Sequence, residues 1–119
     1  MGATRMRVLV CGGRDYSDRQ YLWGFLDEYG PPEITEIVSG MANGADTLAA
    51  EWAIRNGLKL HKFPAIWAMY GKSAGMIRNR QMLVKGRPDL VLAFPGGVGT
   101  KNMVSLAKEA GVKVIKVGW

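Results

Sequence analysis

The sequence has 119 residues, of which 48% are hydrophobic and 22% are charged, so it can fold around a core of its own and is not a disordered chain. No apolar run approaches the roughly 18 residues of a membrane span, and the N-terminus lacks the pattern of a secretory signal. Cys11 is the only cysteine and His61 the only histidine, which excludes an internal disulfide and any metal centre built from several of these residues. We expect one cytoplasmic domain over residues 1–119, with no metal, no cofactor and no membrane partner.

The charges are distributed unevenly along the chain. The net charge is +6, from 16 basic and 10 acidic residues. Residues 1–51 carry four basic and eight acidic side chains, whereas residues 52–88 carry eight basic side chains and no acidic one. This central block favours an anionic partner, although a solvated basic face would have the same composition.

Strand and helix patterns alternate along the whole chain. Short apolar runs that end at glycine, proline or a polar residue predict strands over residues 6–11, 34–39, 58–63, 90–94 and 112–117. Apolar residues recurring at helical spacing predict helices over residues 18–29, 45–56, 74–85 and 100–110. We expect Ser17 or Asp18 to cap the first helix and Gly30-Pro31-Pro32 to end it, and we expect residues 64–73 to be irregular.

Five strands separated by four helices predict an α/β fold. The expected architecture is a single-domain, Rossmann-like, doubly wound sheet of about five parallel strands with helices on both faces. The strand order 3-2-1-4-5 is favoured because the first and fourth strands each end in a glycine-rich loop. That order places the two loops side by side at the topological switch point, where such sheets bind ligands.

Two glycine-rich loops predict a phosphate-binding site. Gly12 and Gly13 follow the first strand and let the backbone approach a ligand, while Arg14 adds a planar charged group. The second loop follows the most apolar strand and contains Pro95, Gly96, Gly97, Gly99 and Thr100. Its three glycines and the threonine form a nest of backbone amides that would face an anion. The Thr100 hydroxyl would contact phosphate or cap the next helix.

The loop after the second strand contains Ser39, Gly40, Gly44 and Asp46, which we also expect to contribute to the ligand-binding site. Asp46 falls in the first turn of a helix, where a negative charge is favourable without any ligand. It would otherwise accept hydrogen bonds from a ribose or hold a neighbouring loop.

The segment between residues 67 and 79 combines aromatic and basic residues. Trp67 and Tyr70 suit base stacking, and Lys72, Arg78 and Asn79 suit a phosphorylated ligand. The alternative is that Trp67 only caps the core. Arg78 near a helix N-terminus opposes the helix dipole, which favours an external anion or an acidic neighbour.

Four segments together carry a family resemblance: residues 12–16, 39–46, 70–79 and 94–100. In this order they resemble the YspA, YpsA-related branch of the SLOG superfamily, which also contains the LOG-type phosphoribohydrolases and the DNA-processing protein DprA. The resemblance covers essentially the whole chain. It implies a Rossmann-like fold with a nucleotide-derived ligand over the glycine loops. Together with the apolar content of the chain it also implies a homodimer, formed through the helix over 74–85 or the helix over 100–110.

The resemblance leaves the activity open. The LOG-type enzymes have a catalytic glutamate where this sequence has Met103, so binding or sensing of an ADP-ribose-like molecule or a nucleoside phosphate is favoured. The first alternative is a nucleotide-processing hydrolase with Asp15, Asp46 or Arg78 as catalytic candidates. The second is a module that binds nucleic acid through the block of eight basic residues over 52–88. The similarity to DprA, which lies in the motif over 39–46 and in Gly97, implies that the strand would be single-stranded DNA.

Overall fold

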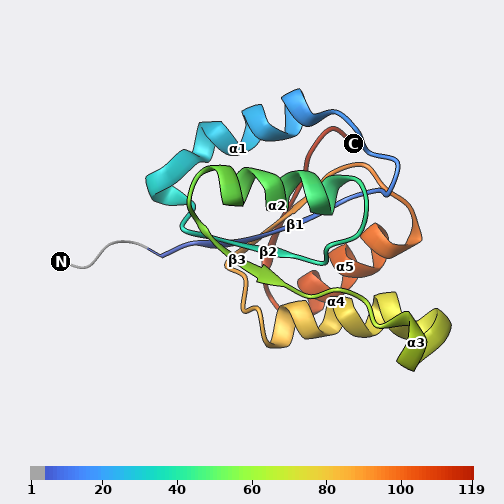
Figure 1. Ribbon diagram of the computed structural model, residues 1–119. Helices are drawn as coiled ribbons and strands as arrows, with labels where there is room; N and C mark the ends of the chain where they lie inside the picture. The colour runs from blue at the N-terminus through green and yellow to red at the C-terminus, as the bar shows by residue number, and fades with distance from the viewer. Residues whose placement is uncertain (1–4) are drawn as a thin grey trace.

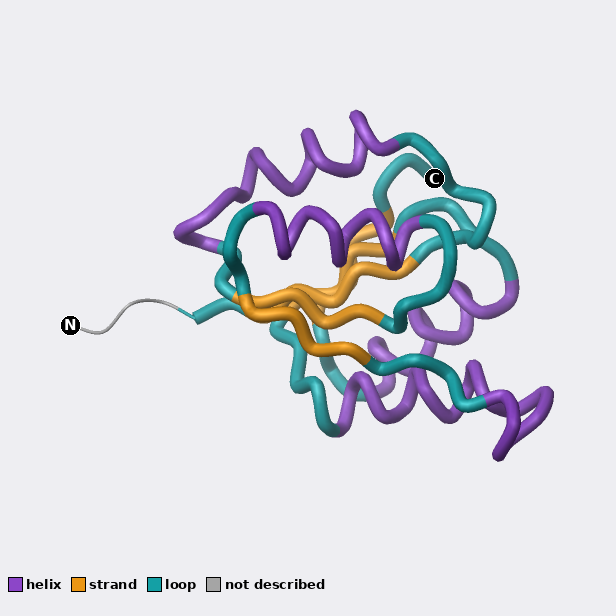
Figure 2. Tube along the Cα trace, viewed as in Figure 1, coloured by secondary structure: helices purple, strands orange, loops and turns teal. Residues whose placement is uncertain are grey.

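The computed structural model describes residues 5–119 as one parallel sheet between two layers of helices (Figures 1 and 2). The strands are β1 (Arg7–Cys11), β2 (Glu36–Ser39), β3 (Lys59–Lys62), β4 (Leu90–Ala93) and β5 (Lys113–Lys116). The helices are α1 (Arg19–Glu33), α2 (Ala45–Arg55), α3 (Trp67–Tyr70), α4 (Ala74–Val84) and α5 (Val98–Glu109), with a 3₁₀ turn η1 (Gly71–Ser73). The sheet order is β3-β2-β1-β4-β5, which confirms the predicted topology.

The sheet has a separate core on each face. Helices α1 and α2 cover one face, and α4 and α5 cover the other (Figure 1). Successive residues of β1 point to opposite faces, so Val8 and Val10 pack under α1 and α2 while Leu9 and Cys11 pack against α4 and α5. No helix among residues 5–119 combines the length and apolar character needed to cross a membrane.

Of the two predicted ends of the first helix, the start is confirmed and the end is wrong. The Asp18 carboxylate accepts a hydrogen bond from the Tyr21 amide at 3.1 Å and caps α1, as the sequence predicts. The prediction that Gly30-Pro31-Pro32 ends this helix is wrong, because α1 continues to Glu33. Gly30 adopts a left-handed conformation with φ of 54°, so the chain changes direction there and the two prolines begin a last helical turn.

Two predictions in the second half are also wrong. Residues 67–73, expected to be irregular, form α3 and η1, neither of which has a buried residue. Helix α5 begins at Val98 instead of Thr100, with Gly97 in the capping position. Thr100 therefore lies inside the first turn and does not cap the helix.

The loops after β1 and β4 touch at the carboxyl end of the sheet. The Gly13 amide donates to the Pro95 carbonyl at 2.8 Å, and the Ala45 amide donates to the Gly13 carbonyl at 3.3 Å. A side chain at Gly12 would place its Cβ 2.6 Å from the Cβ of Ala45. Gly44, with φ of 86°, lies directly against the backbone of Gly13 and admits no side chain. This packing brings the starts of α2 and α5 together.

Candidate functional site

A cavity of about 380 Å³ lies at this carboxyl end of the sheet. Its walls come from the β1–α1 loop, the loop before α2, the segment from α3 to α4, and the start of α5. The cavity therefore occupies the crevice that parallel α/β sheets use for ligands.

Arg78 of α4 reaches into this crevice from below the sheet. Its Nη1 donates to the Gly40 carbonyl at 2.7 Å, and its Nε donates to Asn79 Oδ1 at 3.0 Å. A Cβ at Gly40 would lie 2.7 Å from Arg78 Nη1 and 2.8 Å from Asp46 Oδ2. Only glycine therefore lets the arginine and the carboxylate approach this loop together. Burial lowers the pKa of Arg78, and the Asp46 charge opposes that shift.

Among the described residues that line the cavity, Asp46 is the one acidic residue. It lies in the first turn of α2, is 5% exposed, and accepts a hydrogen bond from the Ala42 amide at 3.3 Å. Burial raises its pKa from 3.8 to about 6, although the Arg78 charge, the Ala42 amide and the Arg14 charge act in the opposite direction. Within residues 5–119, no ion pair of 4.0 Å or less joins Asp46 to an arginine. Because its pKa of about 6 lies below neutral pH, the carboxylate is ionised at pH 7. Because the charge is also buried without a close ion pair, its ionisation costs stability.

Helix α5 begins at the opposite wall with unused backbone donors. No hydrogen bond described for residues 5–119 uses the amides of Val98, Gly99 or Thr100, and the first turn of a helix has no internal acceptors for them. Gly97 supplies no capping side chain, and no atom of the described residues would lie within 4 Å of a Cβ at Gly97 or Gly99. The positive end of the α5 dipole is thus open to an anion.

Asn79 couples the two lower helices at the cavity wall. Its Nδ2 donates to the Gly99 carbonyl at 3.1 Å and to Asn102 Oδ1 at 3.0 Å. Asn79 is buried and also accepts the Arg78 hydrogen bond. The amide therefore fixes the arginine relative to the start of α5.

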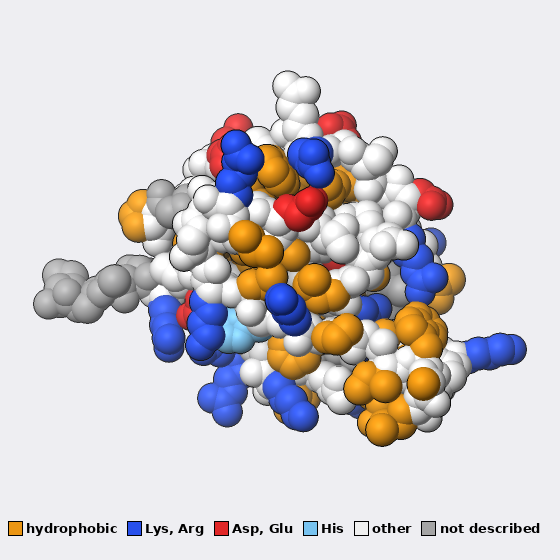
Figure 3. Space-filling view, in the orientation of Figure 1, with side chains coloured by type: hydrophobic (Ala, Val, Ile, Leu, Met, Phe, Trp, Pro, Cys, Tyr) orange, Lys and Arg blue, Asp and Glu red, His pale blue; other side chains and the backbone are white. Residues whose placement is uncertain are grey.

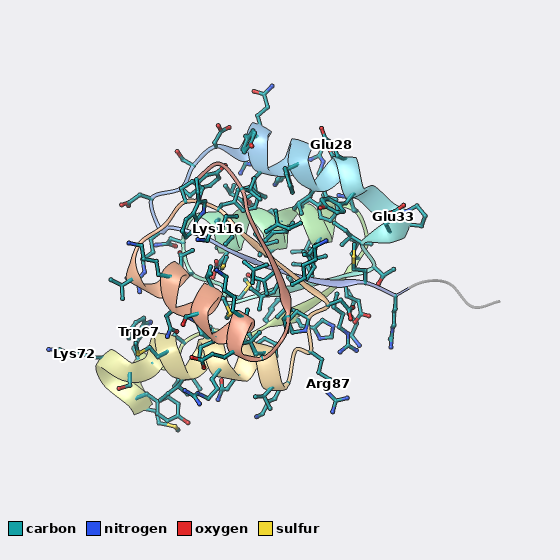
Figure 4. All side chains as sticks on the ribbon, turned by 180° about the vertical axis from the view of Figure 1, so that it is seen from behind. Glu28, Glu33, Trp67, Lys72, Arg87 and Lys116 are labelled. Atoms are coloured by element: carbon teal, nitrogen blue, oxygen red, sulfur yellow. The ribbon has the colours of Figure 1, made fainter. Side chains whose placement is uncertain are left out.

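The outer rim of the cavity is aromatic and basic. The Arg14 guanidinium lies over the Trp67 ring, 5.4 Å from its centroid, although the two residues come from different loops. Trp67 is 49% exposed, so it forms the rim and does not cap the core. Figure 4 shows Lys72 beside it, projecting outward from the tip of the molecule.

Comparisons with known proteins identify the family of this chain. A family model described as the YspA, cpYpsA-related SLOG family matches residues 6–70. The chain belongs to this family. It is 40% identical over 123 residues to the Gene 61 protein of Mycobacterium phage D29, covering 94% of this chain and 96% of that protein. The X-ray structure of DNA processing protein A (DprA) from Streptococcus pneumoniae matches with 19% identity and a TM-score of 0.47. That match covers 92% of this chain and 58% of the DprA chain.

The structure of this SLOG family member brings together most of the residues that the sequence indicates. The cavity is lined by Gly12, Gly13, Arg14, Asp46, Trp67, Lys72, Arg78, Asn79, Gly97, Gly99 and Thr100. Because the Gly13 amide already donates to Pro95, that glycine permits close approach but offers no free donor.

Seven predicted residues do not line the cavity: Asp15, Ser39, Gly40, Gly44, Tyr70, Pro95 and Gly96. Asp15, Pro95 and Gly96 line a neighbouring shallow hollow of about 470 Å³. Ser39 is fully buried, where its hydroxyl donates to the Asp46 carbonyl at 3.0 Å and accepts from the Met41 amide at 3.1 Å. It shapes the loop instead of reaching the cavity.

Sequence reasoning missed seven lining residues: Cys11, Ala42, Gly75, Met76, Met82, Val98 and Asn102. Gly75 and Met82 lie on the same helical face as the predicted residue Asn79, so the helical spacing of α4 could have identified these two. Met103, expected at the position of the LOG-type glutamate, is fully buried in the core under α5. Its neighbour Asn102 lines the cavity instead.

Proposed function

We propose that the protein binds a nucleotide-derived ligand, such as a nucleoside phosphate or an ADP-ribose-like molecule, in this cavity. The observation that carries the proposal is the start of α5, where three unused amides and two glycines without neighbouring atoms face the same space as Arg78. A phosphate group satisfies those amides and the helix dipole together.

The charge and apolar lining of the cavity support the same assignment. Among the lining residues within 5–119, Arg14, Lys72 and Arg78 supply three positive charges and Asp46 supplies one carboxylate. Trp67 and Met76 give the outer wall a large apolar surface on which a base can stack.

Calorimetric titration of the purified protein with AMP, ADP-ribose and adenosine tests this proposal. Gly97→Asp places a carboxylate among the free amides, and we expect it to abolish binding of both phosphorylated compounds. The variant should remain folded because nothing lies within 4 Å of the added Cβ. Gly24→Asp is the matched control, since Gly24 lies on α1 and is equally unobstructed. A folded Gly97→Asp protein with unchanged affinity would overturn the phosphate assignment.

The two arginines provide a second test. Arg14→Ala and Arg78→Ala should each weaken binding of AMP by roughly 1–3 kcal/mol, the range for hydrogen bonds to charged groups. Binding of adenosine should change little. Equal losses for AMP and adenosine would mean that the arginines shape the cavity without holding phosphate.

Asp46 supports hydrolysis of a nucleotide as a second candidate function. It is an acidic group of the cavity wall with a pKa of about 6, which suits proton transfer near neutral pH. Release of free base from nucleoside monophosphates by the unmodified protein, lost in a folded Asp46→Asn variant, would establish this activity. Tight binding of these nucleotides without any turnover would rule out hydrolysis and would support binding as the function.

We also propose that the protein is a homodimer formed through α4 or α5. Both helices lie on one face of the sheet, and Met76 and Val84 of α4 are large, exposed apolar side chains. Light scattering after size exclusion should give twice the chain mass of 13.0 kDa. A monomer at all concentrations tested would contradict it.

A further inference from the structure

The two helical layers carry opposite charge. In the α1–α2 layer and its caps, exposed acidic residues outnumber basic ones: Asp18, Asp27, Glu28, Glu33 and Glu51 against Arg19 and Arg55. On the other side of the sheet, between residues 71 and 110, the exposed charges are Lys72, Arg80, Lys85, Arg87, Lys101 and Lys108 against Asp89 and Glu109. The α4–α5 side of the sheet therefore carries an excess of exposed basic side chains, although Arg55 of the basic block lies on α2.

The outer face of α4 combines this charge with apolar surface. Met76, Arg80 and Val84 follow one another at intervals of four residues and so lie along one stripe. Met76 is 54% exposed and Val84 is 67% exposed. Lys85 and Arg87 extend the stripe beyond the end of the helix, and Figure 4 shows Arg87 and Lys72 at opposite ends of it.

Helix α3, which contacts α4, adds an exposed apolar patch made of Met69 and the aromatic Tyr70. No residue of α3 is buried, and Met69 and Tyr70 are 67% and 37% exposed. Figure 3 shows hydrophobic side chains gathered over α3 and basic side chains along the β3 side of the same face. Exposed apolar groups grouped in this way mark an interaction surface.

We propose that this basic–aromatic face, made of Met69, Tyr70, Met76, Arg80, Lys85 and Arg87, binds single-stranded nucleic acid. A single strand presents phosphates and unstacked bases together, which suits basic side chains interleaved with aromatic and thioether groups. A duplex hides the faces of its bases inside the stack. The Asp and Glu side chains of an acidic peptide have no ring that could stack on Tyr70. The phosphates lie against Arg80, Lys85 and Arg87, and a base stacks on Tyr70.

This surface is separate from nucleotide binding in the cavity. Tyr70, Arg80, Lys85 and Arg87 do not line the cavity, and only Met76 belongs to both. Binding of a strand and binding of a mononucleotide can therefore be measured, and can fail, independently.

Fluorescence anisotropy with a labelled oligothymidine of about 12 nucleotides, within the range of known strand-binding sites, tests the proposal. We expect affinity to fall steeply with salt, because each neutralised phosphate contributes about 0.7 to the logarithmic slope. The double variant Arg80→Ala/Lys85→Ala should reduce that slope by about 1.4 and weaken binding by about tenfold or more at low salt. Lys113→Ala/Lys116→Ala removes the same charge from β5, at the opposite edge of the sheet from β3, and should have little effect.

The aromatic contribution needs its own variant. Tyr70→Ala should weaken strand binding roughly five- to hundredfold through loss of stacking, with the salt slope unchanged. Calorimetry with AMP on every variant reports the cavity separately.

Three outcomes would overturn the proposal. The first is no binding of the oligonucleotide at low salt, which is the result expected if the homodimer forms through α4 and covers this face. Strand binding on α4 therefore requires that the homodimer forms through α5. The second is equal affinity for a duplex of the same length. The third is an equal loss of affinity in the two double variants, which would mean that the strand responds to the net charge of the protein and not to the α4 face.

Discussion

Replacing Asp46 by asparagine should stabilise the protein at neutral pH. The carboxylate is 5% exposed and burial raises its pKa from 3.8 to about 6. Asparagine keeps an oxygen for the Ala42 amide and removes the buried charge. The substitution therefore resembles permanent protonation of Asp46.

The magnitude follows from the displacement of the pKa. A shift of about 2 units corresponds to about 3 kcal/mol of unfavourable interaction with the ionised form. The folded state holds the proton of Asp46 more tightly than the unfolded state, so the wild-type protein loses stability as pH rises through this range. The advantage of Asp46→Asn should be absent below pH about 4, grow between about 4 and 6, and be complete above about 6.

Urea denaturation of both proteins at a series of pH values measures this difference. Asp15→Asn is the matched control, because Asp15 is exposed and outside the cavity, and its stability should change by no more than about 0.5 kcal/mol. The reasoning is refuted if Asp46→Asn is no more stable than wild type at neutral pH, or if its advantage is the same at pH 4 and pH 7. As a second readout, AMP should bind Asp46→Asn more tightly because a negative charge has left the cavity.

Two further predictions concern the opposite end of the sheet and the cavity floor. Glu36 is 4% exposed, and one of its carboxylate oxygens lies 2.7 Å from His61 Nε2, within hydrogen-bond distance. Burial alone would raise the pKa of Glu36, but the His61 hydrogen bond and the charges of Arg7 and Arg5 outweigh burial and lower the pKa. Glu36→Gln should therefore cost about 1–3 kcal/mol at neutral pH, and its deficit in urea denaturation should shrink as pH falls; a constant deficit would contradict this. Cys11 lines the cavity and is buried, and burial raises the pKa of its thiol. Alkylation of Cys11, followed by mass spectrometry, should therefore be slow and should become slower still when ADP-ribose is present. An alkylation rate that ADP-ribose leaves unchanged would place the ligand elsewhere.

The sheet order could be predicted because local signals agree with one another. The β4 segment is wholly apolar and ends in a glycine-rich loop, and β1 ends in another, so both belong at the switch point. Helix α3 could not be predicted, because residues 67–73 contain no repeating apolar face and pack no side chain into the core. The extent of α1 depends on Gly30, whose left-handed conformation lets the chain resume a helical turn at the prolines.

The candidate site could be predicted in position but only partly in detail. A glycine that faces a ligand and a glycine that faces a neighbouring side chain look alike in the sequence. Gly97 is open to the cavity, whereas Gly40 lies beneath Arg78 and Asp46. Asn102 escaped attention because its place in the wall depends on how α4 packs beside α5.

The position of Asn102 gives the sharpest comparison with the LOG-type pattern. Met103 is fully buried, so Met103→Glu forces an unpaired carboxylate into the core and should destabilise the fold by about 3 kcal/mol or more. Asn102→Glu places the carboxylate at the cavity wall, where it can still accept the Asn79 amide, and should leave the fold intact. That variant should bind AMP more weakly than Asn102→Gln, which has the same length without the charge, and release of free base should rise weakly at most, because a carboxylate needs a supporting shell. Base release by a well-folded Met103→Glu protein, with Asn102→Glu inert, would show that the side chain at position 103 turns towards the cavity and would overturn this assignment of the wall.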